Sequence, residues 1–369
     1  MKLSTSREAL FTQLQAVTRV ASTHTAVQAL SGVQLDAGET DVELRATDLE
    51  VGLRVKLDAS VERVGSVVLP GRLLLDVVRA LPQDSVTLEL RATEQDVELT
   101  SGAATFHIRT LRSEDFPPLP EPDREAVVSM PAQAFVNTIV TVARAASRDE
   151  TRPVLTGILV SASGSQLRMV ATDSYRLSVK ETVLEPPLDG SFEANVPARA
   201  LQELARIAQQ GSGESLSVGV GSNQVVFEVD DAVLSSRLID GQFPNHQQLV
   251  PDSFEHELKL AGDEVTEVVR RISLLAQKNA PLRLAFADGE LTISAQTPDV
   301  GEASETIPVA FKGEALEIGF NPDFLRDGLE SVGSGEVVLK LISPLRPGLI
   351  EAGDGSGFEY LIMPIRLNV

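Results

Sequence analysis

Only a few residues of this sequence have side chains and spacings that could support catalysis, and two aspartates stand out among them. Asp48 and Asp173 each end the tripeptide Ala-Thr-Asp, which begins at Ala46 and again at Ala171. Two carboxylates could share general acid and base work. They also occupy corresponding places in a repeated sequence, and aspartate side chains often hydrogen-bond the backbone of a turn. We therefore favour a turn-forming role for both over catalysis.

The remaining candidates for chemistry are equally sparse. The glycine-rich stretches 211–213 and 353–357 do not lead from a strand into a helix, so we interpret them as turns. The sequence has no cysteine and no GxxxxGK[ST] loop. The histidines lack the paired spacing of a metal site, since they are His24, His107, His246 and His256. We expect a protein that is not an enzyme and that holds no metal or cofactor.

The composition indicates a soluble cytoplasmic protein with more than one domain. A chain of 369 residues, 43% of them apolar, is too long for one core and fits two or three domains. The N-terminus lacks the apolar region of a signal peptide, and no apolar run reaches the ~20 residues of a membrane helix. The net charge of −21 disfavours strong nonspecific binding of nucleic acid by the chain as a whole.

The elements that must position the aspartates belong to a sequence unit that occurs three times in the chain. Landmarks recur in the same order at intervals of about 125 residues, as in repeat proteins. Agreement in both order and spacing is improbable by chance. The landmarks are Gly32 and Gly157; Ala46, Ala171 and Ala295; Pro70, Pro197 and Pro322; and Phe116 and Phe243.

Each copy has the same order of expected elements. A helix with one apolar face comes first, alternating strands follow, a second helix opens with a proline at or near its first turn, and further strands close the copy. The apolar faces are Leu10, Leu14 and Val17, then Phe135, Ile139 and Val142, then Val265, Val268, Val269 and Ile272. The expected helices are 7–20, 71–82, 132–148, 198–210, 263–278 and 323–332.

This order predicts an α+β fold of three repeated domains, each with two helices packed on antiparallel β-sheets. The acidic, proline-containing stretches between copies place the domain boundaries. The expected domains are 1–125, 126–253 and 254–369.

Arginines recur at fixed positions on the expected helices. Pairs a heptad apart lie on one helical face, and they occupy equivalent positions after Pro70 and Pro197. Helical charge is usually solvated surface, but repetition in so acidic a chain favours a shared surface that meets phosphate. Because no base-reading motif is present, that contact would be independent of sequence. The repeated arginines are Arg19 and Arg144, and the pairs Arg72 with Arg79 and Arg199 with Arg206.

The triplication and three motifs together resemble one family. The motifs are ATDSYRLSV at 171–179, RLIDGQFPNHQQLVP at 237–251 and YLIMPIRL at 360–367. The combination resembles the bacterial DNA sliding clamp, the β subunit of the replicative DNA polymerase III holoenzyme, over the whole chain. The resemblance implies that each chain forms half of a closed ring, in which two subunits join head-to-tail around duplex DNA. Twelve helices spaced ~8–10 Å apart would leave an opening of ~20–28 Å, which is wide enough for a duplex.

The resemblance also implies which residues face DNA and which meet the second subunit. The basic side chains on or near the helices would face DNA; they are Arg19, Arg72, Arg79, Arg144, Arg148, Arg152, Arg199, Arg206, Arg270, Arg271 and Lys278. An edge strand of the first domain would pair with the third domain of the other subunit. Phe106 and Ile108 would then meet Leu274 and Leu275, and Arg72 would lie near Glu302 and Glu305.

In this family a groove between the second and third domains receives short apolar peptides. Its users are the replicative polymerase, the clamp loader, repair polymerases and ligase-type proteins. The family often has Gly and His where Ser174 and Tyr175 stand, and a basic residue at Gln248, so pocket size and partner preference would differ here. The groove would consist of Leu155, Thr172, Ser174, Tyr175, Arg176, Leu177, Pro244, Gln248, Leu249, Leu361, Met363, Pro364 and Ile365.

Two other functions remain open from the sequence. The chain could be a repeat-built interaction scaffold that never encircles DNA. It could also be an enzyme with a site in a crevice between domains, although no assembled catalytic set is apparent.

Overall fold

The computed structural model describes residues 1–23, 25–120, 127–276, 280–298 and 300–367. It divides into two units, one of residues 1–132 and 206–238 and the other of residues 133–205 and 239–369. Each unit contains two antiparallel sheets with helices packed on them. The fold is therefore α+β, as the sequence predicts.

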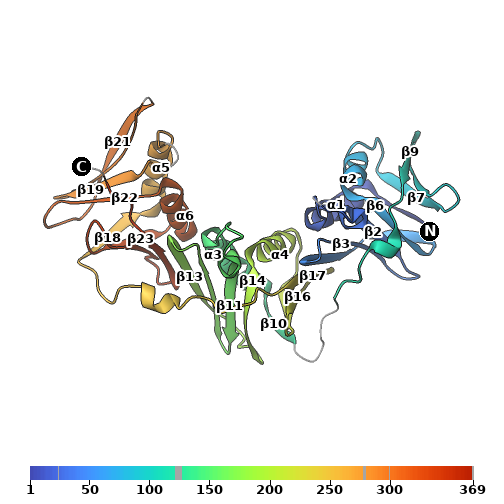
Figure 1. The fold of residues 1–369 in the computed structure, drawn as a ribbon, viewed down its shortest axis with the longest axis horizontal. Helices are drawn as coiled ribbons and strands as arrows, with labels where there is room; N and C mark the ends of the chain where they lie inside the picture. The colour runs from blue at the N-terminus through green and yellow to red at the C-terminus, as the bar shows by residue number, and fades with distance from the viewer. Residues whose placement is uncertain (24, 121–126, 277–279, 299, 368–369) are drawn as a thin grey trace. The chain divides into compact units, whose positions relative to one another are not determined.

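The first unit contains a five-stranded and an eight-stranded sheet (Figure 1). The five-stranded sheet has the order β5 (Ala59–Arg63), β1 (Lys2–Ser6), β7 (Ser85–Arg91), β8 (Asp96–Ser101) and β9 (Ala104–Arg109). The eight-stranded sheet has the order β10 (Val127–Pro131), β15 (Ser215–Val220), β16 (Gln224–Val229), β17 (Ala232–Arg237), β4 (Val51–Lys56), β3 (Val42–Thr47), β2 (Gly32–Ala37) and β6 (Gly65–Pro70). Helices α1 (Arg7–Val20) and α2 (Gly71–Arg79) pack side by side against it.

The second unit contains an eight-stranded and a four-stranded sheet. The first has the order β14 (Ser191–Pro197), β11 (Gly157–Ser163), β12 (Gln166–Thr172), β13 (Arg176–Val183), β25 (Phe358–Ile362), β24 (Gly348–Ala352), β23 (Glu336–Leu341) and β18 (His256–Ala261). The second has the order β21 (Gly301–Pro308), β20 (Glu290–Thr297), β19 (Leu282–Ala287) and β22 (Leu316–Phe320). Its helices include α3 (Ala132–Val142), α5 (Gly262–Ser273) and α6 (Pro322–Val332), and α4 (Ala198–Gln210) contains the boundary between the units.

The three copies of the sequence repeat share one strand scheme. In each copy the opening strand pairs with the group of strands that closes the copy, as β1 does with β7, β10 with β15, and β18 with β23. The middle strands form a second group of four in the orders β6-β2-β3-β4, β14-β11-β12-β13 and β22-β19-β20-β21. The triplication is thus a repeat of topology as well as of sequence.

Neighbouring copies are joined by one strand pair each. The last strand of the second copy, β17, pairs with β4 of the first, and the last strand of the third copy, β25, pairs with β13 of the second. Both pairs are antiparallel. The eight-stranded sheets therefore each combine four strands from two successive copies.

The predicted apolar helix faces form the cores under the sheets. Leu10, Leu14 and Val17 on α1 are each 0% exposed, and the corresponding residues of α3 and α5 are buried as well. Local signals set where helices begin: the Ser6 hydroxyl accepts a hydrogen bond from Ala9 N at the start of α1. These faces are confirmed.

Three helices are shorter than expected. Helix α2 ends at Arg79 rather than at 82, and α5 ends at Ser273 rather than at 278. The first helix of the second copy was expected to reach residue 148, but α3 ends at Val142 and is followed by the 3-10 turn η3 (Ala143–Ala145). Beyond it, Ser147 Oγ accepts a hydrogen bond from Asp149 N, and Asp149 Oδ1 accepts one from Thr151 N. Side chains that bond the nearby backbone compete with the helical pattern, so residues 147–151 form a turn.

Candidate functional site

The Ala-Thr-Asp sequence at 171–173 builds a tight turn between β12 and β13. Thr172 Oγ1 donates to Arg176 O at 2.6 Å and accepts from Ser174 N at 3.2 Å. Asp173 Oδ1 accepts from the amides of Tyr175 and Arg176 at 2.9 and 3.0 Å. These bonds hold Ser174 in the left-handed region, with φ of 79°. The side chains at 174 and 175 therefore project from a fixed turn.

The first copy builds the same turn. Thr47 Oγ1 donates to Val51 O, and Asp48 Oδ1 accepts from the amides of Glu50 and Val51 at 3.0 and 2.8 Å. Leu49 has φ of 78°, close to the 79° of Ser174 in the second copy. The turn-forming role predicted for Asp48 and Asp173 is confirmed.

Beside the second turn lies a buried apolar cluster that could form the floor of a groove. Leu177 at the start of β13 and Leu361 on β25 are 2% and 5% exposed, and they share the cluster with Val170, Val179 and Leu349. Three partly buried residues from 243–254, Phe243, Val250 and Phe254, pack against it. Leu155, in the 3-10 turn η4 (Pro153–Thr156), is also buried.

Exposed apolar side chains stand at the edge of this floor. Tyr175 is 60% exposed, Leu249 49% and Met363 43%. Met363 N donates to Tyr175 O at 2.9 Å, so the turn and the C-terminal segment are joined directly. Large apolar side chains left exposed around a buried apolar floor are typical of a surface that binds another apolar chain. We call Tyr175, Leu249 and Met363 the rim.

A hollow of about 910 Å³ adjoins the rim. Gln248 and Leu249 of the 3-10 turn η5 (His246–Leu249) line it, together with Ile342 and Arg346 of the third copy. Ile342 and Arg346 lack any motif of their own, so sequence reasoning missed them.

The other predicted groove residues have varied environments. Pro244 and Gln248 are exposed, whereas Pro364 and Ile365 are partly buried. Ile365 N donates to Gly319 O at 2.7 Å, which fixes the end of the segment that carries Met363. Ser174 Oγ accepts from Arg152 Nη1 at 3.0 Å, so Arg152, expected to face DNA, also contacts the turn.

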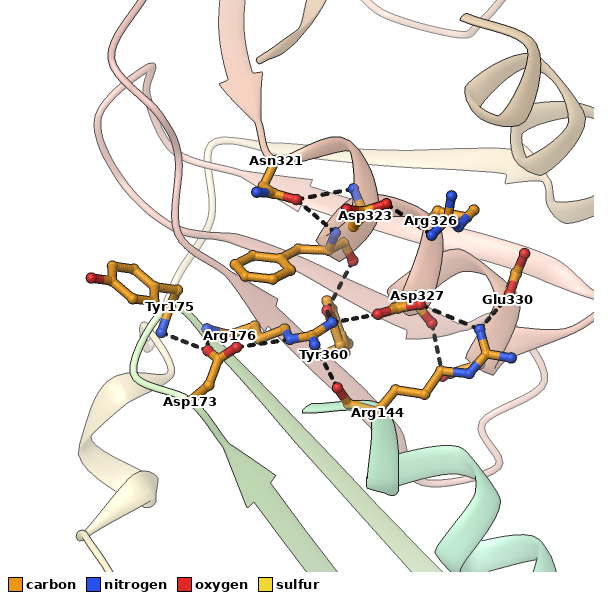
Figure 2. A network of polar contacts seen from close by, with 12 residues as sticks. Arg144, Asp173, Tyr175, Arg176, Asn321, Asp323, Arg326, Asp327, Glu330 and Tyr360 are labelled. Atoms are coloured by element: carbon orange, nitrogen blue, oxygen red, sulfur yellow. Dashed lines mark hydrogen bonds and ion pairs between the residues drawn. The ribbon is translucent and has the colours of Figure 1, made fainter. Parts of the chain in front are cut away.

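Arg176 points away from the rim and into a polar network (Figure 2). Its side chain is 9% exposed, and its guanidinium lies over the ring of Phe324 at 4.3 Å. All three of its nitrogens donate hydrogen bonds. The acceptors are Asp173 Oδ2 at 3.1 Å, Asp327 Oδ2 at 2.6 Å, Tyr360 Oη at 3.3 Å and the carbonyl oxygen of Arg144.

The network continues from Asp327 to two further arginines. Arg144 Nη1 donates to Asp327 Oδ1 at 3.4 Å and to Glu330, and Arg270 Nη2 donates to Glu330 Oε1 at 2.9 Å. The hydrogen bond from Arg144 holds the pKa of Glu330 below its ordinary value. Burial raises the pKa of the Tyr360 phenol, which donates to Phe324 O at 2.8 Å. Arg144 and Arg270 are thus paired with carboxylates within the chain.

The other arginines expected to face DNA lie on exposed positions. Arg79 is 3.5 Å from Asp76 and lies over the Phe11 ring, and Arg271 forms a bidentate ion pair with Glu305 at 2.7 and 3.1 Å. Lys278 lies outside the described residues. The remaining exposed members are Arg19, Arg72, Arg148, Arg199 and Arg206.

The residues expected at the subunit boundary lie on two sheet edges and one helix end. Phe106 and Ile108 are on β9, the edge of its sheet, where Phe106 is partly exposed and Ile108 is buried. Glu302 and Glu305 are on β21, the edge of the four-stranded sheet. The helix end carries Leu274, which is 83% exposed, and Leu275, which is partly exposed.

Within the described parts of the chain, no group of three or more metal-ligating side chains is found. No helix among the described residues is long and apolar enough to cross a membrane.

Comparisons with known proteins agree on one family along the whole chain. Models of the DNA polymerase III beta subunit match residues 1–120 (N-terminal domain), 129–245 (central domain) and 247–366 (C-terminal domain). A beta sliding clamp of Streptomyces coelicolor is 32% identical over 378 residues, with 100% of both chains covered. Among solved structures, a DNA polymerase sliding clamp from Bacillus subtilis has 28% identity and a TM-score of 0.91, and a Bartonella birtlesii sliding clamp bound to griselimycin has 27% and 0.92. Both cover 100% of the two chains.

Proposed function

The chain belongs to the family of DNA polymerase III beta subunits, the beta sliding clamps, and from that premise we propose that it works as a ring of two subunits. The ring encloses duplex DNA, slides along it and tethers the replicative polymerase as a non-catalytic processivity factor. Each subunit contributes three domains, 1–125, 126–253 and 254–369.

The strongest support for a ring is the strand scheme of the repeats. We call the strand pair that joins two copies a seam. Each seam pairs the last strand of one copy with the fourth middle strand of the copy before it, as in β17 with β4 and β25 with β13. One last strand, β9 of the first copy, and one fourth middle strand, β21 of the third copy, are left at sheet edges. Pairing β9 of one subunit with β21 of the other continues the rule head-to-tail.

The existing seams also give the register of the proposed one. Val233 opposes Arg54 in the first seam, and Glu359 opposes Val179 in the second. The equivalent positions in β9 and β21, counted from the neighbouring hairpin partners, are Thr105 and Ser304.

Burial along β9 is consistent with a missing partner. Phe106 corresponds to Leu234 and Tyr360, which are each 1% exposed beneath their seams. Phe106 itself is partly exposed in the single chain. A second subunit would bury it as the neighbouring copy buries its counterparts, and burial of such apolar area drives association.

Engineered cysteines test this seam, because the natural sequence has none. Paired residues of an antiparallel ladder have Cα atoms ~4.5–5.5 Å apart, within the ~4.4–6.8 Å that a disulfide spans. Thr105→Cys with Ser304→Cys should give a covalent dimer under mild oxidation. The matched control, Thr105→Cys with Glu302→Cys, is out of register by two residues and should cross-link far less. Equal cross-linking of both pairs, or of neither, contradicts the proposed register.

Contact with DNA in this proposal is weak and independent of sequence. The chain carries a net charge of −21, and Arg144, Arg270 and Arg271 are already paired with carboxylates. Few arginines would then compete strongly for phosphate, which suits sliding. Retention on DNA would come from closure of the ring rather than from affinity. Exposed arginines such as Arg72 and Arg148 are our candidates for the contacts that remain.

The groove beside the 173–176 turn is the proposed docking site for partners. A short apolar peptide of the replicative polymerase, the clamp loader, a repair polymerase or a ligase-type protein would lie on the floor of Leu177 and Leu361 and contact Met363. A flexible methionine suits partners of differing shape. We take griselimycin, which is bound to the Bartonella birtlesii relative, as a probe and propose that it binds this groove.

Titration calorimetry with griselimycin tests the groove. Met363→Ala removes a contact from the rim and should weaken binding by ~1–3 kcal/mol, the size of a significant interface contact. Val183→Ala, an apolar residue 73% exposed on β13 outside the rim, is the control and should bind as the unaltered chain does. Equal affinity for the Met363→Ala variant and the unaltered chain would remove Met363 from the proposed site.

A further inference from the structure

The turn at Asp173 repeats the turn at Asp48, but the residue that ends it differs. Val51 ends the first turn and is 4% exposed. Arg176 ends the second, and its side chain is nearly as buried, at 9% exposed. A buried guanidinium is costly unless it is paired and hydrogen-bonded. Since the turn forms equally well with valine, formation of the turn does not explain the arginine.

The partners of Arg176 belong to another copy of the repeat. Asp327 lies on α6 and Tyr360 on β25, both in the third copy, whereas Arg176 begins β13 of the second (Figure 2). The ion pair thus joins residues 151 positions apart in sequence. It ties the turn to α6 and to β25, the strand that carries Leu361 of the floor.

The turn that Arg176 and Asp327 hold in place carries Tyr175, one of the three residues of the rim. Tyr175, 60% exposed, immediately precedes Arg176, and its carbonyl accepts the hydrogen bond from Met363 N. Movement of the turn would therefore displace Tyr175 and Met363 together. Four of the five N–H groups of the Arg176 guanidinium already donate within the chain, so a ligand could bond it without displacing a contact only through the second N–H of Nη2.

We propose that Arg176 is a positioning residue of the groove, which acts through Asp327 to fix the rim and does not bind the ligand itself. This role rests on the proposed function, since it concerns the same groove. It assigns Asp327, which lies outside the groove residues expected from the sequence, to groove affinity.

The surroundings of Asp327 make it a firm anchor. Its second oxygen accepts from Arg144, which in turn is held by Glu330, and Glu330 also accepts from Arg270. Its side chain is 19% exposed. Charge-assisted hydrogen bonds of this kind are stronger than neutral ones. The Asp327 carboxylate should therefore stay in position when a ligand binds at the rim.

A double-mutant cycle measured by titration calorimetry with griselimycin tests the proposal. The variants are Arg176→Gln, Asp327→Asn and the two combined, with Arg283→Gln as the matched control because Arg283 forms an exposed ion pair with Glu317 on the four-stranded sheet. Each single variant should bind roughly 10-fold more weakly, and the double variant no more weakly than the worse single one, since coupled residues are not additive. Arg176→Lys retains a charge for Asp327 and should recover part of the affinity. Arg283→Gln should bind normally.

Each other outcome has a distinct meaning. If Arg176→Gln weakens binding and Asp327→Asn does not, Arg176 binds the ligand directly and the proposal is wrong. If neither changes binding while Met363→Ala does, the groove stands and the positioning role is wrong. An unaltered chain that does not bind griselimycin contradicts both. Far-ultraviolet circular dichroism, which reports secondary structure, identifies variants that fail to fold.

Discussion

Truncation of Leu274 should separate the subunits without affecting the fold of either. Leu274 follows α5 and is 83% exposed in the single chain, so its side chain contributes little to folding. In the proposed ring it is buried against the first domain of the other subunit. At ~0.8 kcal/mol for each carbon removed from a buried side chain, Leu274→Ala costs about 2.4 kcal/mol at one seam.

A head-to-tail ring has two identical seams, so the same substitution acts twice. The total of about 5 kcal/mol corresponds to roughly three orders of magnitude in the dimer dissociation constant, at about 1.4 kcal/mol for each factor of ten. Sedimentation equilibrium over a wide concentration range should show the dimer giving way to the 39.5 kDa chain.

The matched control is Val183→Ala, which truncates an apolar residue of similar exposure and should leave the dissociation constant unchanged. Far-ultraviolet circular dichroism should be the same for all three proteins. A dimer as tight with Leu274→Ala as without it would refute the assignment of Leu274 to the seam.

Two further predictions concern the network and the core around it. Gly328→Ala places a Cβ 2.6 Å from Cδ1 of the buried Tyr360. Overpacking of ~1–3 kcal/mol should therefore lower the melting temperature, despite the better helix propensity of alanine. The control Gly335→Ala, whose Cβ meets open space, should leave the melting temperature unchanged. The lowered pKa of Glu330 means that its contribution to stability is complete above the ordinary glutamate value of ~4.3 and is lost as pH falls through the folded-state value. The free energy of unfolding, measured with denaturant from about pH 6 to about pH 3, should therefore fall more steeply for the unaltered chain than for Glu330→Gln. Parallel curves for the two proteins would exclude this contribution of Glu330 to stability.

Elements with a local signal could be predicted from the sequence. The apolar face of Leu10, Leu14 and Val17 has helical spacing and is buried. The turns at Asp48 and Asp173 depend on side chains within three residues of each aspartate. Such features need no knowledge of the rest of the chain, because the interactions that form them are local.

Contacts between distant segments could not be predicted in the same way. The pairing of β17 with β4 joins strands of two copies, and the sequence of neither strand alone indicates its partner. Arg176 was expected to line the groove, but the acidic partner that draws it inward is 151 residues away. The helix expected to continue to 148 ends at Val142 because Ser147 and Asp149 bond the backbone of their own turn.

The measurement that tests the central claim most directly is retention on DNA of defined topology. The protein is loaded on nicked circular plasmid with a cell-derived clamp loader, free protein is removed, and half of the sample is linearised. A closed ring should stay on the circle and run off the linear molecule. Equal loss from both, or equal retention on both, would show that ordinary affinity holds the protein to DNA, and would favour an interaction scaffold that never encircles the duplex.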